Sequence, residues 1–168
     1  MGSDERRKNL VNLAMAYMGL ARRHNRIPPL VLVGPGSHWA QGGSISGAQI
    51  LATGYLETRE IRALMAASVA LVLPSLEEGF GLPVAEAMAA GLPVVCSKGS
   101  ALEEIAAGAA TLVNPLDTAS IANGIERLLD DPARAEEQRR KGLEQSRLFD
   151  WDTAAARTLE FYRHVLES

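Results

Sequence analysis

The chain has one cysteine, few aromatic residues and no strong excess of either charge, and each shortage excludes a class of protein. Because Cys96 stands alone, no disulfide cross-links the chain, and a reducing compartment is allowed. A net charge of -3 gives no broad positive surface for nucleic acid, so we expect no nucleic-acid partner. No apolar run is long enough to span a bilayer, and no secretory signal pattern opens the sequence.

The remaining composition favours one α/β domain. Hydrophobic residues make up 47% of the 168 residues, which is enough for a sizeable core, and we expect a single domain over residues 1–168. Alanine is abundant, which suits helices packed closely on a sheet rather than a β-sandwich. We interpret Cys96, in an apolar run, as a core residue, since a catalytic thiol needs a nearby base and access to solvent.

The stretch Pro74–Ser97 predicts a turn and a short helix between two strands. One apolar run ends just before Pro74, and a second, Pro93–Cys96, follows a glycine. Pro83 suits the first turn of a helix, where its missing N–H would be unpaired anyway. Gly79 and Gly81 allow close approach of the backbone to a ligand, and free amides at the helix start favour phosphate or another anion.

Two carboxylates bracket this turn, Glu78 and Glu86, with seven residues between them. Carboxylates repel a phosphate group, so we expect Glu78 and Glu86 to have a role other than binding phosphate. Carboxylates accept paired hydrogen bonds from vicinal hydroxyls, and a nucleoside diphosphate sugar carries a diol on either side of its diphosphate. For Glu86 the alternative is a purely helical role, because glutamate is common in the first turn for dipole reasons.

The sequence EGFGLPVAEAMAAGLPVV, which includes both acids, resembles the donor-binding motif of retaining GT-B glycosyltransferases of family 4. The preceding PS, the GFGLP turn, the EAMA helix start and the PVV strand all match. The resemblance runs from RKN at Arg7–Asn9 through VLVG and TGYL to the FDW at Phe149. It covers nearly the whole chain, but only the second half of such an enzyme.

The resemblance implies a fold and an activity. We expect a Rossmann-like three-layer α/β domain with a mostly parallel sheet, which forms the C-terminal half of a GT-B fold. It would bind a UDP-, GDP- or similar nucleotide sugar without metal, for transfer of a hexose with retention of configuration. The N-terminal acceptor domain would be missing, so the domain alone would be a poor catalyst. A cytoplasmic location, with peripheral contact of the full-length enzyme at the inner membrane face, is also expected.

The resemblance also assigns site residues. Lys8 would reach the donor diphosphate and stabilise its growing charge, and Glu78 would be the second catalytic residue. The family often has an arginine a few residues earlier, where this chain has Gly2, Ser3 and Asp4, so Arg7 is the candidate substitute. The alternative is a solvated charged loop, which we favour for Arg6. The full predicted donor-binding set is Arg7, Lys8, Tyr55, Leu56, Glu78, Gly79, Phe80, Gly81, Leu82 and Glu86, with Tyr55 and Leu56 beside the nucleobase.

Strands and helices alternate along the chain, which favours a parallel sheet. The predicted strands are 30–33, 49–53, 69–73, 93–96 and 111–113. The predicted helices include 9–23, one capped by Thr58, one opened by a capping box of Ser100 and Glu103, one capped by Asp117 or Thr118, and 133–146. A doubly wound domain should open with a hydrophobic strand, and the polar residues 1–8 do not supply one.

Two further segments contain patterns that resemble binding motifs. Residues 34–47 predict a Gly/Ser-rich loop, and Trp39 occupies the place of the third glycine in a dinucleotide fingerprint, which therefore fails. We assign no role to His38 or Trp39. Asp150-Trp151-Asp152 could hold a metal in a GT-A enzyme, but here an aspartate cap on a helix over residues 153–166, with Trp151 as a packed anchor, is the better interpretation.

The last helix should carry an apolar side, formed by Phe161, Tyr162 and Val165, which the resemblance directs toward the absent domain. A different class of function is a non-catalytic module that binds a sugar nucleotide or a protein, and it predicts a self-sufficient surface. A sugar-nucleotide epimerase lacks support because its acid and base residues cannot be identified.

Overall fold

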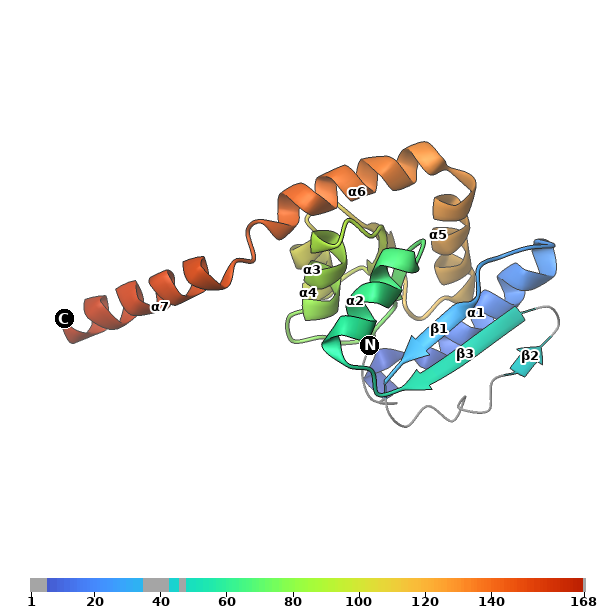
Figure 1. The fold of residues 1–168 in the computed structure, drawn as a ribbon, viewed down its shortest axis with the longest axis horizontal. Helices are drawn as coiled ribbons and strands as arrows, with labels where there is room; N and C mark the ends of the chain where they lie inside the picture. The colour runs from blue at the N-terminus through green and yellow to red at the C-terminus, as the bar shows by residue number, and fades with distance from the viewer. Residues whose placement is uncertain (1–5, 35–42, 46–47, 168) are drawn as a thin grey trace.

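The computed structural model describes residues 6–34, 43–45 and 48–167 and has an α/β architecture (Figure 1). Five strands run parallel within their sheets: β1 (Leu30–Val33), β3 (Ala48–Gly54), β4 (Leu71–Leu73), β5 (Val94–Ser97) and β6 (Thr111–Val113). β2 (Gly43–Ile45) is antiparallel to β3. The helices are η1 (Arg6–Lys8), α1 (Leu10–Arg23), α2 (Thr58–Ala67), α3 (Leu82–Ala89), α4 (Ala101–Ala106), α5 (Thr118–Asp130), α6 (Pro132–Ser146) and α7 (Trp151–Leu166).

The strands form two three-stranded sheets, ordered β1-β3-β2 and β4-β5-β6, where the sequence predicted one. β5 is the middle strand of its sheet and is buried at all four residues, whereas β1 and β4 are partly open. Alternation along β5 divides the core, since successive side chains point to opposite faces. Val95 packs with α1 and α5, while Val94 and Cys96 pack with α3 and α4. These two helical layers around the strands confirm the predicted three-layer class.

Two predicted helix caps need correction. Glu57, not Thr58, caps α2 and forms a capping box with Glu60. Ser100 caps α4 by accepting from the amide of Leu102, but the carboxylate of Glu103 accepts from the amide of Gly99, so the predicted capping box is incomplete.

Two further expectations concern residues 34–47 and 69–73. The predicted Gly/Ser-rich loop contains strand β2, and His38 and Trp39 lie outside the described residues. The strand predicted from Val69 begins two residues later, at Leu71. These differences arise because short strands are decided by pairing across the sheet rather than by local sequence.

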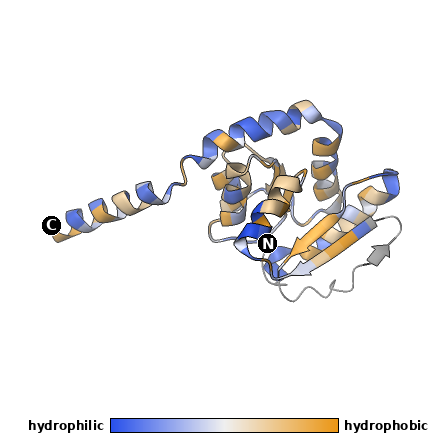
Figure 2. Ribbon diagram, viewed as in Figure 1, coloured by the Kyte–Doolittle hydropathy of each residue, from blue (hydrophilic) through white to orange (hydrophobic). Residues whose placement is uncertain are grey.

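The last helix, α7, projects away from the rest of the molecule (Figure 1). No residue of α7 is buried, and Phe161, Tyr162 and Val165 are each more than half exposed, as predicted. Trp151 is 79% exposed, so its predicted role as a packed anchor is wrong. Hydrophobic and hydrophilic residues alternate along α7, whereas α6 is largely hydrophilic (Figure 2). Among the described residues, no helix is both long and apolar enough to cross a membrane.

Candidate functional site

Glu78 is the centre of the candidate site, in the turn that follows β4. The chain leaves β4 through Pro74 and Ser75, both fully buried, and Ser75 Oγ donates a hydrogen bond of 2.9 Å to Glu78 Oε1. The Glu78 side chain is only 8% exposed. Burial and this hydrogen bond restrict the carboxylate to one orientation.

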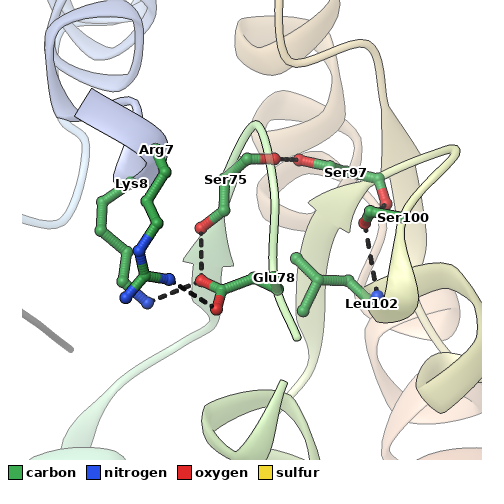
Figure 3. A network of polar contacts seen from close by, with 7 residues as sticks. All are labelled: Arg7, Lys8, Ser75, Glu78, Ser97, Ser100 and Leu102. Atoms are coloured by element: carbon green, nitrogen blue, oxygen red, sulfur yellow. Dashed lines mark hydrogen bonds and ion pairs between the residues drawn. The ribbon is translucent and has the colours of Figure 1, made fainter. Parts of the chain in front are cut away.

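Two cations from the start of the chain contact this carboxylate (Figure 3). Lys8 Nζ lies 2.6 Å from Glu78 Oε1, and Arg7 Nη1 lies 3.1 Å from Oε2. The backbone reinforces the contact, since the carbonyl of Arg7 accepts a 2.7 Å hydrogen bond from the amide of Leu76. Arg7, Lys8 and Glu78, each predicted as a site residue, therefore form one cluster with a net positive charge.

The environment of Glu78 favours its ionised form. Burial raises the pKa of this carboxyl, but hydrogen bonds from Lys8 and Ser75 and the charges of Lys8 and Arg7 outweigh burial, so the pKa is lowered from 4.5. Glu78 is therefore a carboxylate at neutral pH, and it can accept hydrogen bonds but cannot act as a general acid there.

Asn9 is a positioning residue for which the sequence suggested no role. Its Nδ2 donates to the carbonyl of Pro74 at 2.9 Å and to that of Pro115 at 2.7 Å, so it joins the segments that follow β4 and β6. Its backbone is left-handed, with φ of 59°. Asparagine tolerates this conformation better than most residues, and the RKN match at Arg7–Asn9 was the other signal that the sequence offered.

The turn from Glu78 to α3 is held against its neighbours by close packing. Gly81 has φ of 104°, and a Cβ there would lie 2.5 Å from Leu102 Cδ2. Gly79 differs, because a Cβ there would meet no atom within 4 Å. The Phe80 ring packs edge-on against Phe149, with centroids 5.9 Å apart, so the segment before α7 supports the turn.

Two more serines extend this support under the turn. Ser97 Oγ donates to the carbonyl of Ser75, and Ser100 Oγ accepts from the amide of Leu102, which lies under Gly81 (Figure 3). The turn between β4 and α3 is therefore tied to the segment after β5 by both hydrogen bonds and packing.

The other predicted site residues do not join the cluster. Pro83 lies in the first turn of α3, as expected, and Leu82 is half exposed. Glu86 is exposed, and its side chain has no hydrogen bond or ion pair to another described residue. Tyr55, which follows β3, is 78% exposed, and Leu56 is half-buried; neither contacts Glu78, Lys8 or Arg7 through a polar bond in the described structure.

Cys96 and Asp150 have structural roles in the described part of the chain. Burial, with a smaller contribution from Glu103, raises the pKa of the Cys96 thiol to about 12, as suits a core residue. Asp150 caps α7 by accepting from the amide of Thr153 at 2.9 Å. Elsewhere, ligand atoms of His24, Glu126 and Asp130 lie within 4.8 Å of one another, but both oxygens of Glu126 already bond His24 or Arg23.

Comparison with known families identifies the family of the chain that carries this cluster. The family model described as "Glycosyl transferases group 1" matches residues 1–131. This chain belongs to that family. The predicted family and the predicted fold class are therefore both confirmed.

The group 1 glycosyltransferase chain spans less than half the length of the relatives it matches. It is 34% identical over 170 residues to the O-antigen chain mannosyltransferase B of Escherichia coli, covering 97% of this chain and 44% of that protein. It is 36% identical over 162 residues to the glycogen synthase of Mycobacterium tuberculosis, covering 90% and 39%.

Among solved structures, the sucrose-phosphate synthase of Thermosynechococcus elongatus superposes with a TM-score of 0.79 at 28% identity, covering 97% of this chain and 43% of that one. The family match, over residues 1–131, includes the Glu78 turn.

Proposed function

We propose that this chain is the donor-binding domain of a retaining glycosyltransferase, spanning residues 1–168, and that the cluster of Arg7, Lys8 and Glu78 at the start of α3 binds a nucleotide diphosphate sugar. The contact of Lys8 with Glu78 is the observation that carries the proposal. It places a nearly buried ammonium against the turn that leads into α3, and an ammonium and a helix N-terminus each favour an anion.

The diphosphate would occupy the space in front of α3. Gly79 has no neighbour that a Cβ would meet, so the backbone of the turn leaves room for a ligand to approach. As the bond to the sugar breaks, the nucleoside diphosphate gains negative charge, which the fixed ammonium of Lys8 stabilises most in the transition state. Arg7, with its side chain 43% exposed, can turn from Glu78 to the diphosphate.

The two acids would hold hydroxyl groups on either side of the diphosphate. Glu78, ionised and oriented by Ser75, accepts from the sugar, and the exposed Glu86 accepts from the ribose. The leaving phosphate would deprotonate the acceptor in a front-side attack, so no protein nucleophile is needed. Tyr55 and Leu56 would border the nucleobase. The donor would bind without metal, through Lys8, Arg7 and the α3 amides.

An acceptor-binding domain would complete the enzyme. The exposed apolar residues of α7 support this, because a self-sufficient binding module would not be expected to leave such a face uncovered. α7 begins two residues after Phe149, which packs on the Glu78 turn through Phe80, so a domain held by α7 would lie near the site. We place the enzyme in the cytoplasm, with its acceptor reached at the inner membrane face.

Calorimetric titration with UDP- and GDP-sugars tests the assignment. Lys8→Ala and Glu86→Ala should each weaken donor binding about tenfold or more, because each removes a charged hydrogen-bond partner. Glu77→Ala, at an exposed neighbouring position, is the matched control and should bind as the parent does. If Lys8→Ala and Glu86→Ala bind like the control, these residues do not hold the donor.

A further inference from the structure

The turn that carries Glu78 has few backbone contacts of its own. Within the described part of the chain, no backbone N–H or C=O group of residues 77–80 forms a hydrogen bond. Backbone bonding resumes at Gly81, whose carbonyl accepts from the amides of Val84 and Ala85 in α3. Amides that are free to meet a ligand do nothing to fix the turn, so side chains must hold its shape.

Side chains hold the turn at both ends. At its start, Glu78 is bonded by the two cations and the serine described above. Toward its end, the Phe80 ring meets the Phe149 ring edge-on, with centroids 5.9 Å apart and 84° between the ring planes. Between these two contacts lies Gly79, where a Cβ would meet no atom within 4 Å. The ring pair is therefore an anchor for the part of the turn that the cations do not reach.

Phe149 is itself fixed to the folded core. Its side chain is partly buried and packs on the apolar cluster that includes residues of β5, α3 and α4. The preceding helix, α6, is also held in place, since Gln145 Nε2 donates to the carbonyl of Ile105 at 3.2 Å. A Cβ at Gly142 of α6 would lie 3.2 Å from Met88 Cγ of α3, so these two helices are in close contact. Phe149 thus gives Phe80 a firm surface to pack against.

We propose that Phe149 is a positioning residue of the donor site, and that it acts through Phe80 to fix the turn between Glu78 and α3. The inference rests on the proposed function, because this turn is where the donor would bind. Phe149 does not touch the donor. By holding the turn in one shape before binding, it reduces the conformational entropy lost on binding and so raises donor affinity.

Two simpler roles for these rings lead to different expectations. If Phe149 only packs in the core, its removal lowers the free energy of unfolding but leaves the donor affinity of the folded protein unchanged. If Phe80 contacts the donor without help from Phe149, then removing the Phe149 ring has no effect on affinity while Phe80 remains.

A double-mutant cycle on donor binding separates these roles. Calorimetry with UDP-glucose and GDP-mannose compares the parent with Phe149→Ala, Phe80→Ala and the double variant. Phe149→Ala should weaken binding about three- to tenfold, in line with the strength of an edge-to-face aromatic pair. The double variant should bind no more weakly than Phe80→Ala alone, because Phe149 acts through Phe80. Leu148→Ala, at an adjacent residue that is 68% exposed, is the matched control and should bind as the parent does.

NMR order parameters of the Gly79, Phe80 and Gly81 amides test the positioning without any donor. They should fall in Phe149→Ala and stay at the parent value in Leu148→Ala. Urea denaturation establishes that each variant is folded under the conditions of measurement. If Phe149→Ala does not fold, Phe149→Leu, which keeps most of the apolar volume, takes its place in both experiments.

Three results overturn the inference: Phe149→Ala keeps the order parameters of the parent, it binds the donor as the parent does, or its loss of affinity multiplies with that of Phe80→Ala. If the parent itself binds neither sugar nucleotide, the failure is that of the proposed function. The order parameters then decide by themselves whether Phe149 positions the turn.

Discussion

Gly79 and Gly81 lie two positions apart in one turn, yet only one is required by packing. Gly81→Ala combines a left-handed backbone with a contact of 2.5 Å to the Leu102 side chain, so it should lower the free energy of unfolding by about 2–4 kcal/mol. Gly79→Ala is the matched control, and it should change this free energy by less than about 1 kcal/mol. Urea denaturation measures both, and equal losses would contradict the packing that the structure shows.

Glu78 should make stability depend on acid pH. Its pKa is lowered in the folded protein, so its contribution is fully present above 4.5 and is lost as the pH falls through the lower folded value. Glu78→Gln removes this contribution, about 1–2 kcal/mol, so its unfolding free energy should be lower at neutral pH and less sensitive to acid. Urea titrations between about pH 3 and 7 check this, with Glu77→Gln as the exposed control. If the unfolding free energy of Glu78→Gln falls with acid as steeply as that of the parent, Lys8 and Arg7 do not stabilise the folded carboxylate.

At the scale of elements, Asn9 holds the ends of β4 and β6 together. Asn9→Ala removes hydrogen bonds of 2.9 and 2.7 Å and leaves a left-handed alanine, so we expect a loss of about 2–3 kcal/mol in unfolding free energy. Asn12 donates one longer bond, 3.3 Å, to the same carbonyl of Pro115. Asn12→Ala should therefore lower the unfolding free energy by less than about 1 kcal/mol. Thermal unfolding measures both variants. If Asn9→Ala and Asn12→Ala cause equal losses, the two strand ends do not depend on Asn9.

Most elements follow from local pattern, and the exceptions have a physical reason. α1 was predicted to within one residue because its apolar positions recur at helical spacing along fourteen residues. β2 could not be predicted, because three residues of Gly-Ser-Ile become a strand only by pairing with β3. The misassigned cap at Thr58 has another cause: Glu57 and Glu60 bond one another's backbone, and this reciprocal geometry outweighs the usual preference for threonine.

At the scale of the whole molecule, α7 should control association rather than stability. A variant that ends at Phe149 removes no residue that is buried in the described part of the chain, so its unfolding free energy should stay within about 0.5 kcal/mol of the parent value. The intact chain should self-associate most near its isoelectric point of about 5.6, where net charge no longer opposes contact between exposed apolar faces.

Sedimentation velocity at several pH values measures this association for both chains. The variant should remain monomeric where the intact chain associates. If the shortened chain associates to the same extent, the contact lies elsewhere, and the open edges of β1 and β4 become the surface to examine.

The sequence suggested the residues of the cluster but not their contacts. Lys8, Arg7, Glu78 and Glu86 were proposed because their spacing and neighbours resemble a family motif, and Glu78 could be placed at a strand end by the apolar run before it. The ion pair between Lys8 and Glu78 spans 70 positions, so no local pattern could reveal it. The bonds from Ser75 to Glu78 and from Ser97 to Ser75 were missed for a related reason, because serine is ordinary in sequence and only burial makes its hydroxyl group decisive.

By itself, the sequence determined the order of strands and helices, the family and the identity of the charged residues, because these depend on patterns within a few residues of one another. Only the tertiary structure decided that Lys8 and Arg7 contact Glu78, that Trp151 is exposed, and that β1 and β4 line a common cavity. Such features depend on which distant segments meet, and on the free energy of burying or leaving open the surfaces between them.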